Sequence, residues 1–230
     1  MAKRANNDID GLYEDIRSKY IDARANGYRS HRYFLREQEI LLSVIDKNPG
    51  TVLDLACGSG LMVLPLLDNA DTVIGLDYNV YACVAAKQHG LEVIRGNTFL
   101  LPLRNNSIDH TCNCQFLNQQ SHDEMKLLLS ECYRISNSPG KVILIWRNGN
   151  SLIHRIAHII FKIYDRLCKR SSFPVVNHHI TEVENYANLL GFETLIKQTI
   201  FPLLGWKSSN LHGILSNLIG ASYFLVLKKH

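Results

Sequence analysis

Two acidic residues and a glycine-rich turn stand where ligand chemistry could occur. An apolar run ends on Asp54 within TVLDLACGSGLMVLPLL, residues 51–67, and Gly58 and Gly60 follow it. The next apolar run, VIGLD, ends on Asp77. Glycines at a strand-to-helix turn let the backbone approach a ligand closely, because they carry no side chain. The pattern therefore predicts a ligand-binding turn at residues 56–60.

Three of four ligand classes fit this turn poorly. A phosphate loop needs Gly-x4-Gly-Lys-Ser/Thr, and the sequence contains no such run. A dinucleotide turn needs a third small residue, but counting from Gly58 and Gly60 places Val63 there. A flavin site meets the same objection. S-adenosylmethionine is the fourth class, and since it carries no phosphate, the turn need only admit its amino-acid end.

The sequence also resembles a known family in several segments. VLDLACGSG resembles the first motif of the class I S-adenosylmethionine-dependent methyltransferases, with Ala56 in place of the motif's first glycine. Three further segments keep the family's order: VIGLDYN, GNTFLLPLRNNSIDHTCNCQFLNQ and ECYRISNSPGKVILIW. The resemblance covers Val52 to Trp146 and implies S-adenosylmethionine as cofactor and S-adenosylhomocysteine as product.

The resemblance implies a role for each matching residue near the first two strands. The methionine end of the cofactor would be lined by Asp54, Ala56, Cys57, Gly58 and Gly60. Asp77, 23 residues after Asp54, would accept hydrogen bonds from both ribose hydroxyls. Tyr78 would pack on the adenine.

The resemblance also implies contacts from later segments. Asn97 and Thr98 would face the adenine edge. The family usually has Asp at position 97, so Asn97 could accept a hydrogen bond but without the charge. Cys114 and Gln115, just past the fourth predicted strand, would lie near the methyl donor.

Methyl transfer from a sulfonium is an in-line displacement, in which positioning can supply much of the catalysis. A general base is therefore optional for some acceptors. His122 is a candidate base, and the alternative is that Ser121–Asp123 caps the next helix. His178 and His179 are further candidates.

Several acceptor classes lack their motifs in this sequence. After the fourth strand, NCQF has no proline, unlike DNA and glutamine amide methyltransferases. Cys112 follows Thr111, but without the Pro-Cys partner of RNA cytosine-5 enzymes. A small-molecule or lipid-like acceptor is predicted, and nucleic acid is disfavoured. A non-catalytic cofactor-binding regulator and an RNA methyltransferase remain the alternatives.

Alternating strand and helix patterns must position these residues. The predicted strands are Val52–Ala56, Val73–Asp77, Leu91–Arg95, Ile108–Asn113, Val142–Trp146, Phe192–Phe201 and Ala221–Lys228. Helix-like stretches lie near 61–69, 79–89, 122–137 and 181–190. This order predicts an α/β, Rossmann-like sheet of seven mostly parallel strands, with helices on both faces and an antiparallel strand near one edge. Residues 1–50 would form a helical cover, and 51–230 the core with a cap at about 147–190.

Two flanking segments could cover the site. In the N-terminal segment, Tyr20, Tyr28, Tyr33 and Arg36 are the residues of interest. Arg36 is expected to be a surface charge, and the alternative is that it meets the donor's carboxylate. Residues 151–170, SLIHRIAHIIFKIYDRLCKR, form an amphipathic helix pattern with five Lys/Arg and one Asp. This helix could cap the acceptor pocket or contact an anionic membrane. His154 and His158 have no third ligand in view, so no metal site is predicted.

Bulk composition limits the remaining possibilities. The chain has 230 residues, 46% hydrophobic, 20% charged and a net charge of +4, which is too mild to indicate nucleic-acid binding by itself. No signal peptide is apparent, and the six cysteines show no paired framework, which predicts reduced thiols. No apolar run reaches the length of a membrane span. The expected location is the cytoplasm, with peripheral contact at the inner membrane face as the alternative if residues 151–170 bind a membrane.

Overall fold

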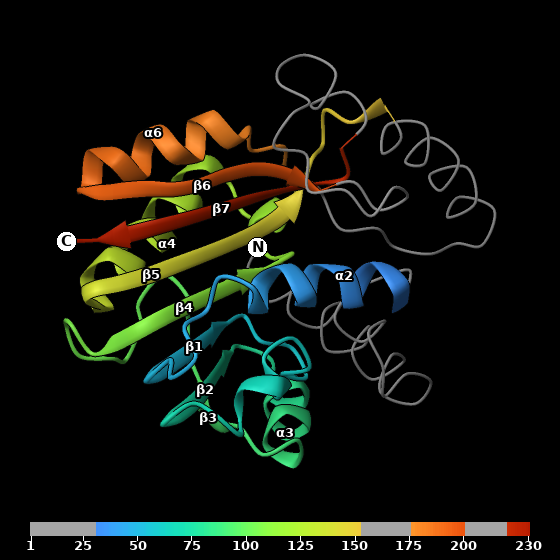
Figure 1. Ribbon diagram of the computed structural model, residues 1–230, viewed down its shortest axis with the longest axis vertical. Helices are drawn as coiled ribbons and strands as arrows, with labels where there is room; N and C mark the ends of the chain where they lie inside the picture. Colours follow the sequence, from blue (N-terminus) through green and yellow to red (C-terminus); the bar gives the residue numbers. More distant parts are fainter. Residues whose placement is uncertain (1–30, 153–175, 201–219) are drawn as a thin grey trace, which may run out of the picture.

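A seven-stranded sheet forms the centre of the chain (Figure 1), for which a computed structural model describes residues 31–152, 176–200 and 220–230. The strand order is β3-β2-β1-β4-β5-β7-β6. Strands β1 to β5 pair in parallel, whereas β7 is antiparallel to both β5 and β6. The predicted fold class is confirmed. The strands are β1 (Thr51–Leu55), β2 (Thr72–Asp77), β3 (Glu92–Arg95), β4 (Ile108–Cys114), β5 (Ser136–Arg147), β6 (Phe192–Ile200) and β7 (Ser222–Lys229).

Helices cover both faces of this sheet. Helices α4 (His122–Ile135) and α6 (Ile180–Leu190) pack on one face, and α2 (His31–Leu42) and α3 (Val80–Gln88) pack on the other (Figure 1). Strand β5 serves both layers, because successive side chains of a strand point to opposite faces. Leu144 and Trp146 join the α4–α6 side, whereas Ile143 and Ile145 join the α2–α3 side. These apolar layers fix the carboxyl ends of the strands, where the predicted site residues lie.

The helix predicted near 61–69 is wrong. The chain there forms turns and a short 3₁₀ helix, η2 (Leu64–Leu66). Pro65 has no backbone N–H and is tolerated only in the first turn of a helix. Only six residues separate Pro65 from the start of β2 at Thr72, so no longer helix develops.

Helices α3 and α4 start at recognisable caps. Asn79 accepts hydrogen bonds from the backbone N–H groups of Tyr81 and Ala82 and starts α3. Ser121 and Glu124 form a reciprocal capping box at the start of α4. The cap expected at Ser121–Asp123 is therefore confirmed.

Part of the predicted N-terminal and cap segments lies outside the described residues. Helix α2 lies within the helical cover predicted for residues 1–50. Tyr20, Tyr28 and residues 153–170 of the amphipathic helix pattern lie outside the described ranges, as do His154 and His158. Within the described ranges, no helix has both the length and the apolar character needed to cross a membrane.

Candidate functional site

The turn after β1 contains three residues with left-handed backbone. Ala56, Gly58 and Gly60 have φ values of 60°, 53° and 77°. A β-carbon added to Gly60 would lie 2.8 Å from Cδ2 of Leu91, so only glycine fits there without a shift. Ala56, which replaces the family's glycine, tolerates the left-handed conformation as the smallest residue with a side chain. The turn is thus tight and packs closely against Leu91. Such a turn lets the backbone approach a ligand closely.

Asp77 joins this turn to the second strand. Its Oδ2 accepts a hydrogen bond from the Gly58 backbone N–H at 2.9 Å, and its Oδ1 accepts one from the Asn79 N–H at 2.8 Å. Burial raises the pKa of this carboxyl, and the backbone hydrogen bonds oppose that rise. Each carboxylate oxygen retains a further lone pair for a ligand hydroxyl. The two predicted binding motifs therefore meet at one carboxylate.

Asp54 is buried and incompletely satisfied. Its exposure is 2%, and its Oδ2 atom has no hydrogen-bond partner in the described part of the chain. Burial, followed by the charge of nearby Asp77, raises the pKa of Asp54 to about 7. A buried carboxylate oxygen that has no hydrogen-bond partner among the described residues, next to the predicted ligand-binding turn, suits a positively charged group. The ammonium and the sulfonium of S-adenosylmethionine are such groups. The residues present therefore fit the implied cofactor.

The residues predicted for the adenine side lie just after the carboxyl ends of β2 and β3. Tyr78 is exposed, and Arg95 donates to its backbone carbonyl and lies 5.8 Å from its ring centre. Thr98 is buried. The carbonyl oxygen of Asn97 already accepts a hydrogen bond from the Phe99 N–H at 2.9 Å, within a local turn. A ligand contact through Asn97 would therefore use its second lone pair or its amide N–H.

Gln115 lies at the carboxyl end of β4 and contacts two other segments. Its backbone has φ of 60°, and its Nε2 donates to both carboxylate oxygens of Glu37, at 2.8 and 3.0 Å. The same Nε2 lies 3.3 Å from Oγ of Ser222, which also bonds the hydroxyl of Tyr33. Burial and the Glu37 charge raise the pKa of Tyr33 well above its usual value. One polar cluster, which we call the Glu37 cluster, thus consists of Tyr33 and Glu37 of α2, Gln115 just after β4, and Ser222 of β7.

Sequence reasoning missed Glu37. This residue is fully buried on α2, one turn after Phe34 and one turn before Leu41, which are both in the core. An acid on the apolar face of an amphipathic helix is the signal that could have identified it. Arg36, for which a surface charge was the first interpretation and a donor contact the alternative, pairs with Glu39 at 2.5 Å on the same helix.

His122 lies at the start of α4 and pairs with Glu182 of α6, with 2.5 Å between Nδ1 and Oε1. His178 is buried beside it, with 4.8 Å between the ring centres. His179 caps α6 by accepting from the Thr181 N–H. The described contacts of His122 are thus with α6 and its preceding loop, and its role as a base stays a prediction.

Five cysteines are free in the described residues, and burial raises the pKa of Cys112 and Cys114 well above the usual range.

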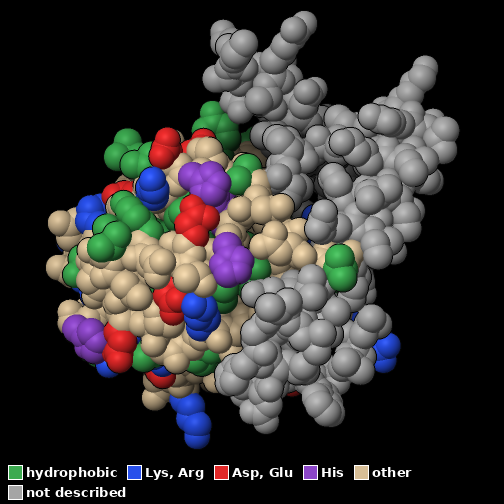
Figure 2. All heavy atoms as spheres, turned by 90° about the horizontal axis from the view of Figure 1, so that it is seen from above, with side chains coloured by type: hydrophobic (Ala, Val, Ile, Leu, Met, Phe, Trp, Pro, Cys, Tyr) green, Lys and Arg blue, Asp and Glu red, His purple; other side chains and the backbone are tan. Residues whose placement is uncertain are grey.

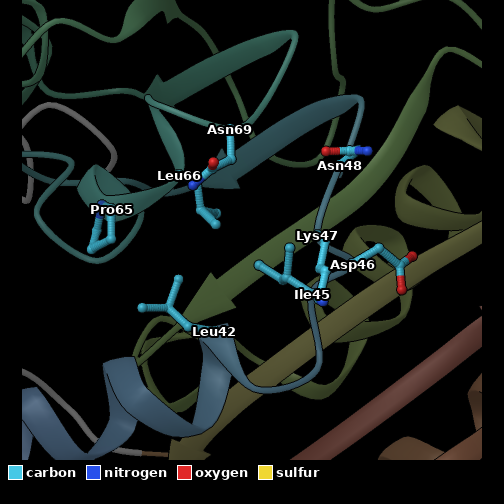
Figure 3. A pocket seen from close by; sticks show the side chains of 8 residues that line it. All are labelled: Leu42, Ile45, Asp46, Lys47, Asn48, Pro65, Leu66 and Asn69. Atoms are coloured by element: carbon cyan, nitrogen blue, oxygen red, sulfur yellow. The ribbon is translucent and has the colours of Figure 1, made fainter.

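A cavity of about 540 Å³ lies between the end of α2, the loop entering β1 and the η2 turn (Figure 3). None of the predicted donor-site residues lines it, so the ligand turn is a separate feature.

Comparison with known proteins agrees with this geometry. Residues 53–144 match the sequence profile of the methyltransferase domain family. The chain carries a class I S-adenosylmethionine-dependent methyltransferase domain. Its cofactor is therefore S-adenosylmethionine. No curated protein sequence matches the chain at a significant level.

Solved structures share the fold of this methyltransferase domain. A chain from the complex of the Haloferax volcanii Trm112 methyltransferase activator with a methyltransferase has 17% identity and a TM-score of 0.66, covering 90% of this chain and 94% of that one. A Thermotoga maritima protein described as a possible histamine N-methyltransferase has 20% identity and a TM-score of 0.66, covering 86% and 89%. Magnesium protoporphyrin IX methyltransferase from Synechocystis, solved with bound S-adenosylhomocysteine, has 15% identity and a TM-score of 0.60, covering 85% and 84%.

Proposed function

We propose that this methyltransferase acts on a small or lipid-like acceptor, which the Glu37 cluster receives beside Gln115. The observation that carries the proposal is the fully buried carboxylate of Glu37, bonded to Gln115 at the carboxyl end of β4. Buried charges are rare without a partner or a function. A recessed polar group suits a small acceptor better than a folded nucleic acid, which needs an extended basic surface.

Two solved relatives support an acceptor of this kind. One is described as a possible histamine N-methyltransferase and another as a magnesium protoporphyrin IX methyltransferase. Both descriptions name small acceptors. The shared fold alone would not carry the proposal, since one fold serves many substrates.

Different residues of the chain bind the cofactor and position the acceptor in this proposal. Bound S-adenosylmethionine supplies an activated methyl group on a sulfonium. Asp77 and the left-handed turn hold the ligand's sugar and amino-acid ends, and the buried Asp54 balances its positive charge. Glu37 holds a hydroxyl or amine of the acceptor through a charge-assisted hydrogen bond and keeps it in line for attack. The buried walls exclude water from competing for that position.

Cofactor binding is tested first, by calorimetric titration with S-adenosylhomocysteine. We expect binding by the wild-type protein and a loss of at least tenfold in affinity for Asp77→Asn. The matched control is Asp71→Asn, because Asp71 is an exposed acid just before the same strand. Equal affinity for all three proteins would contradict the assigned ribose contact.

The acceptor role is tested by turnover. A panel of amines, phenols, quinones and lipid-like compounds is screened by S-adenosylhomocysteine release. We expect Glu37→Gln to lose most turnover and to keep its affinity for S-adenosylhomocysteine, whereas Glu39→Gln, an exposed acid on the same helix, keeps both. Unchanged turnover in Glu37→Gln would refute the role of the cluster. Tight cofactor binding without turnover on any acceptor would favour the non-catalytic alternative.

A further inference from the structure

Three potential metal ligands converge on the α4–α6 side of the molecule. They are His122 at the start of α4, His178 in the loop before α6, and Glu182 in the first turn of α6. One ligand atom from each lies within 4.8 Å of the others. Among the residues that the structure describes, this is the one such group of three. Figure 2, which looks onto the α6 side, shows histidine and acidic side chains adjoining on that surface.

His178 is prepared to act as a ligand. Its exposure is 1%, and its Nε2 lies 2.9 Å from the backbone carbonyl oxygen of Gln120. A carbonyl oxygen can only accept, so Nε2 carries the hydrogen and Nδ1 carries a bare lone pair. Nδ1 is buried and has no hydrogen-bond partner in the described residues. A ring nitrogen fixed by a carbonyl on its far side is the arrangement that orients metal-binding histidines.

His122 and Glu182 supply the other two ligands from the surface. Their contact is 2.5 Å long, and their side chains are 53% and 39% exposed. The ring of His122 meets that of His178 at 73°, edge to face. Because both surface side chains have room to rotate, they can close the 4.8 Å spread to the shorter separations that a bound ion requires. A simple ion pair would explain His122 and Glu182, but it would leave the lone pair of His178 without a role.

We propose that His122, His178 and Glu182 form a binding site for a divalent transition metal of the zinc type. Two neutral imidazoles and one carboxylate are a common ligand set for such ions, and a water would complete the coordination. The argument for this site does not rest on the proposed acceptor function.

The ion would fasten the loop before α6 to the start of α4. The Val176 carbonyl already accepts from the Asn118 side chain, and the His178 carbonyl accepts from the Trp146 ring N–H at 2.9 Å. A metal would add a link from this loop to the start of α4. The site is therefore a structural clamp between the two helices that cover one face of the sheet.

The test uses the full chain after chelator treatment and dialysis, titrated with Zn²⁺ by calorimetry and with Co²⁺ by visible absorption. We expect the wild type to bind one equivalent of Zn²⁺. Glu182→Gln and His122→Ala should each lower the Zn²⁺ affinity by at least 30-fold. The matched control is His230→Ala, because His230 pairs with Glu193 at 2.7 Å in a similar ion pair without a third ligand. Its Zn²⁺ affinity should equal that of the wild type.

Co²⁺ reports the ligand set directly. The wild type should show d–d absorption from bound Co²⁺, and Glu182→Gln should lose it. His178→Gln should also lose it if the variant folds, and Glu182→Gln decides the question if it does not, since Glu182 is at the surface. Zn²⁺ should raise the melting temperature of the wild type and not that of Glu182→Gln. Equal Zn²⁺ affinity and equal Co²⁺ spectra in the wild type and Glu182→Gln would overturn the proposal.

Discussion

Replacing Asp54 with Asn should change how stability depends on pH. Burial raises the pKa of Asp54 from 3.8 to about 7 in the folded chain. Below pH 3.8 the carboxyl is protonated in both the folded and unfolded states, so it imposes no penalty. Between that pH and about 7, the folded state keeps a proton that the unfolded chain has lost, so stability falls as pH rises. Above about pH 7 Asp54 is ionised in both states, and the stability lost through this group no longer changes with pH.

The size of the effect follows from the shift. At 1.36 kcal/mol per pKa unit, full ionisation of Asp54 costs about 4 kcal/mol, of which about 2 to 3 kcal/mol appears between pH 5 and 8. Asn cannot ionise, so Asp54→Asn should escape this cost. We expect the free energy of unfolding of the wild type to fall over that interval by about 2 to 3 kcal/mol more than that of the variant.

Urea denaturation of the ligand-free protein at pH 5, 6, 7 and 8 measures this difference. Asp71→Asn is the control, because it removes an exposed acid just before β2, the strand next to Asp54. Its stability should depend on pH as that of the wild type does. Parallel pH profiles for the wild type and Asp54→Asn would refute the buried-acid reasoning. A second readout is proton release at pH 6.5: S-adenosylhomocysteine should displace a proton from the wild type, because its ammonium favours ionised Asp54, and not from the variant.

Three further substitutions test the local geometry, each measured by urea denaturation. Gly60→Ala should destabilise by about 1 to 3 kcal/mol and weaken S-adenosylhomocysteine binding, because the new methyl meets Leu91 at 2.8 Å with φ at 77°; unchanged binding would contradict the tight turn. Ser121→Ala should cost about 1 kcal/mol through the lost α4 cap, and no loss would mean that the capping box carries no stability. Leu129→Ala should cost about 2 to 5 kcal/mol, since the side chain is fully buried, and leave ligand affinity in the folded protein unchanged; an affinity loss would imply that α4 packing reaches the ligand turn.

Local pattern was enough to predict most of the sheet. Strands such as Val142–Trp146 are apolar on both faces, and the structure buries both faces between helices. The helix near 61–69 failed because apolar spacing outweighed one residue, Pro65, in the prediction. The acidic turn residues were found because the donor motif is contiguous in sequence, from Asp54 to Gly60.

Contacts between distant segments were beyond sequence reasoning. Glu37 meets Gln115 across 78 residues, and His122 meets Glu182 across 60. The sequence can mark Glu37 as an acid on an apolar helix face and His122 as a candidate base, but it does not show which distant residue each of them meets. Only the packing of α2 against the end of β4, and of α4 against α6, brings the partners together.

The connection between β4 and α4 links the two proposed sites. Gln115 begins it with its side chain in the Glu37 cluster and its backbone N–H bonded to Ile145 at 2.7 Å. Asn118 follows, buried, accepting from the Arg147 N–H and donating to its carbonyl. Two residues later, the Gln120 carbonyl orients His178. The first two contacts tie the connection to β5 and the third ties it to the loop before α6. A metal at His122 would therefore restrain the same short stretch that carries Gln115. The clamp would therefore act on the acceptor side by holding its backbone in place, and not by touching the acceptor.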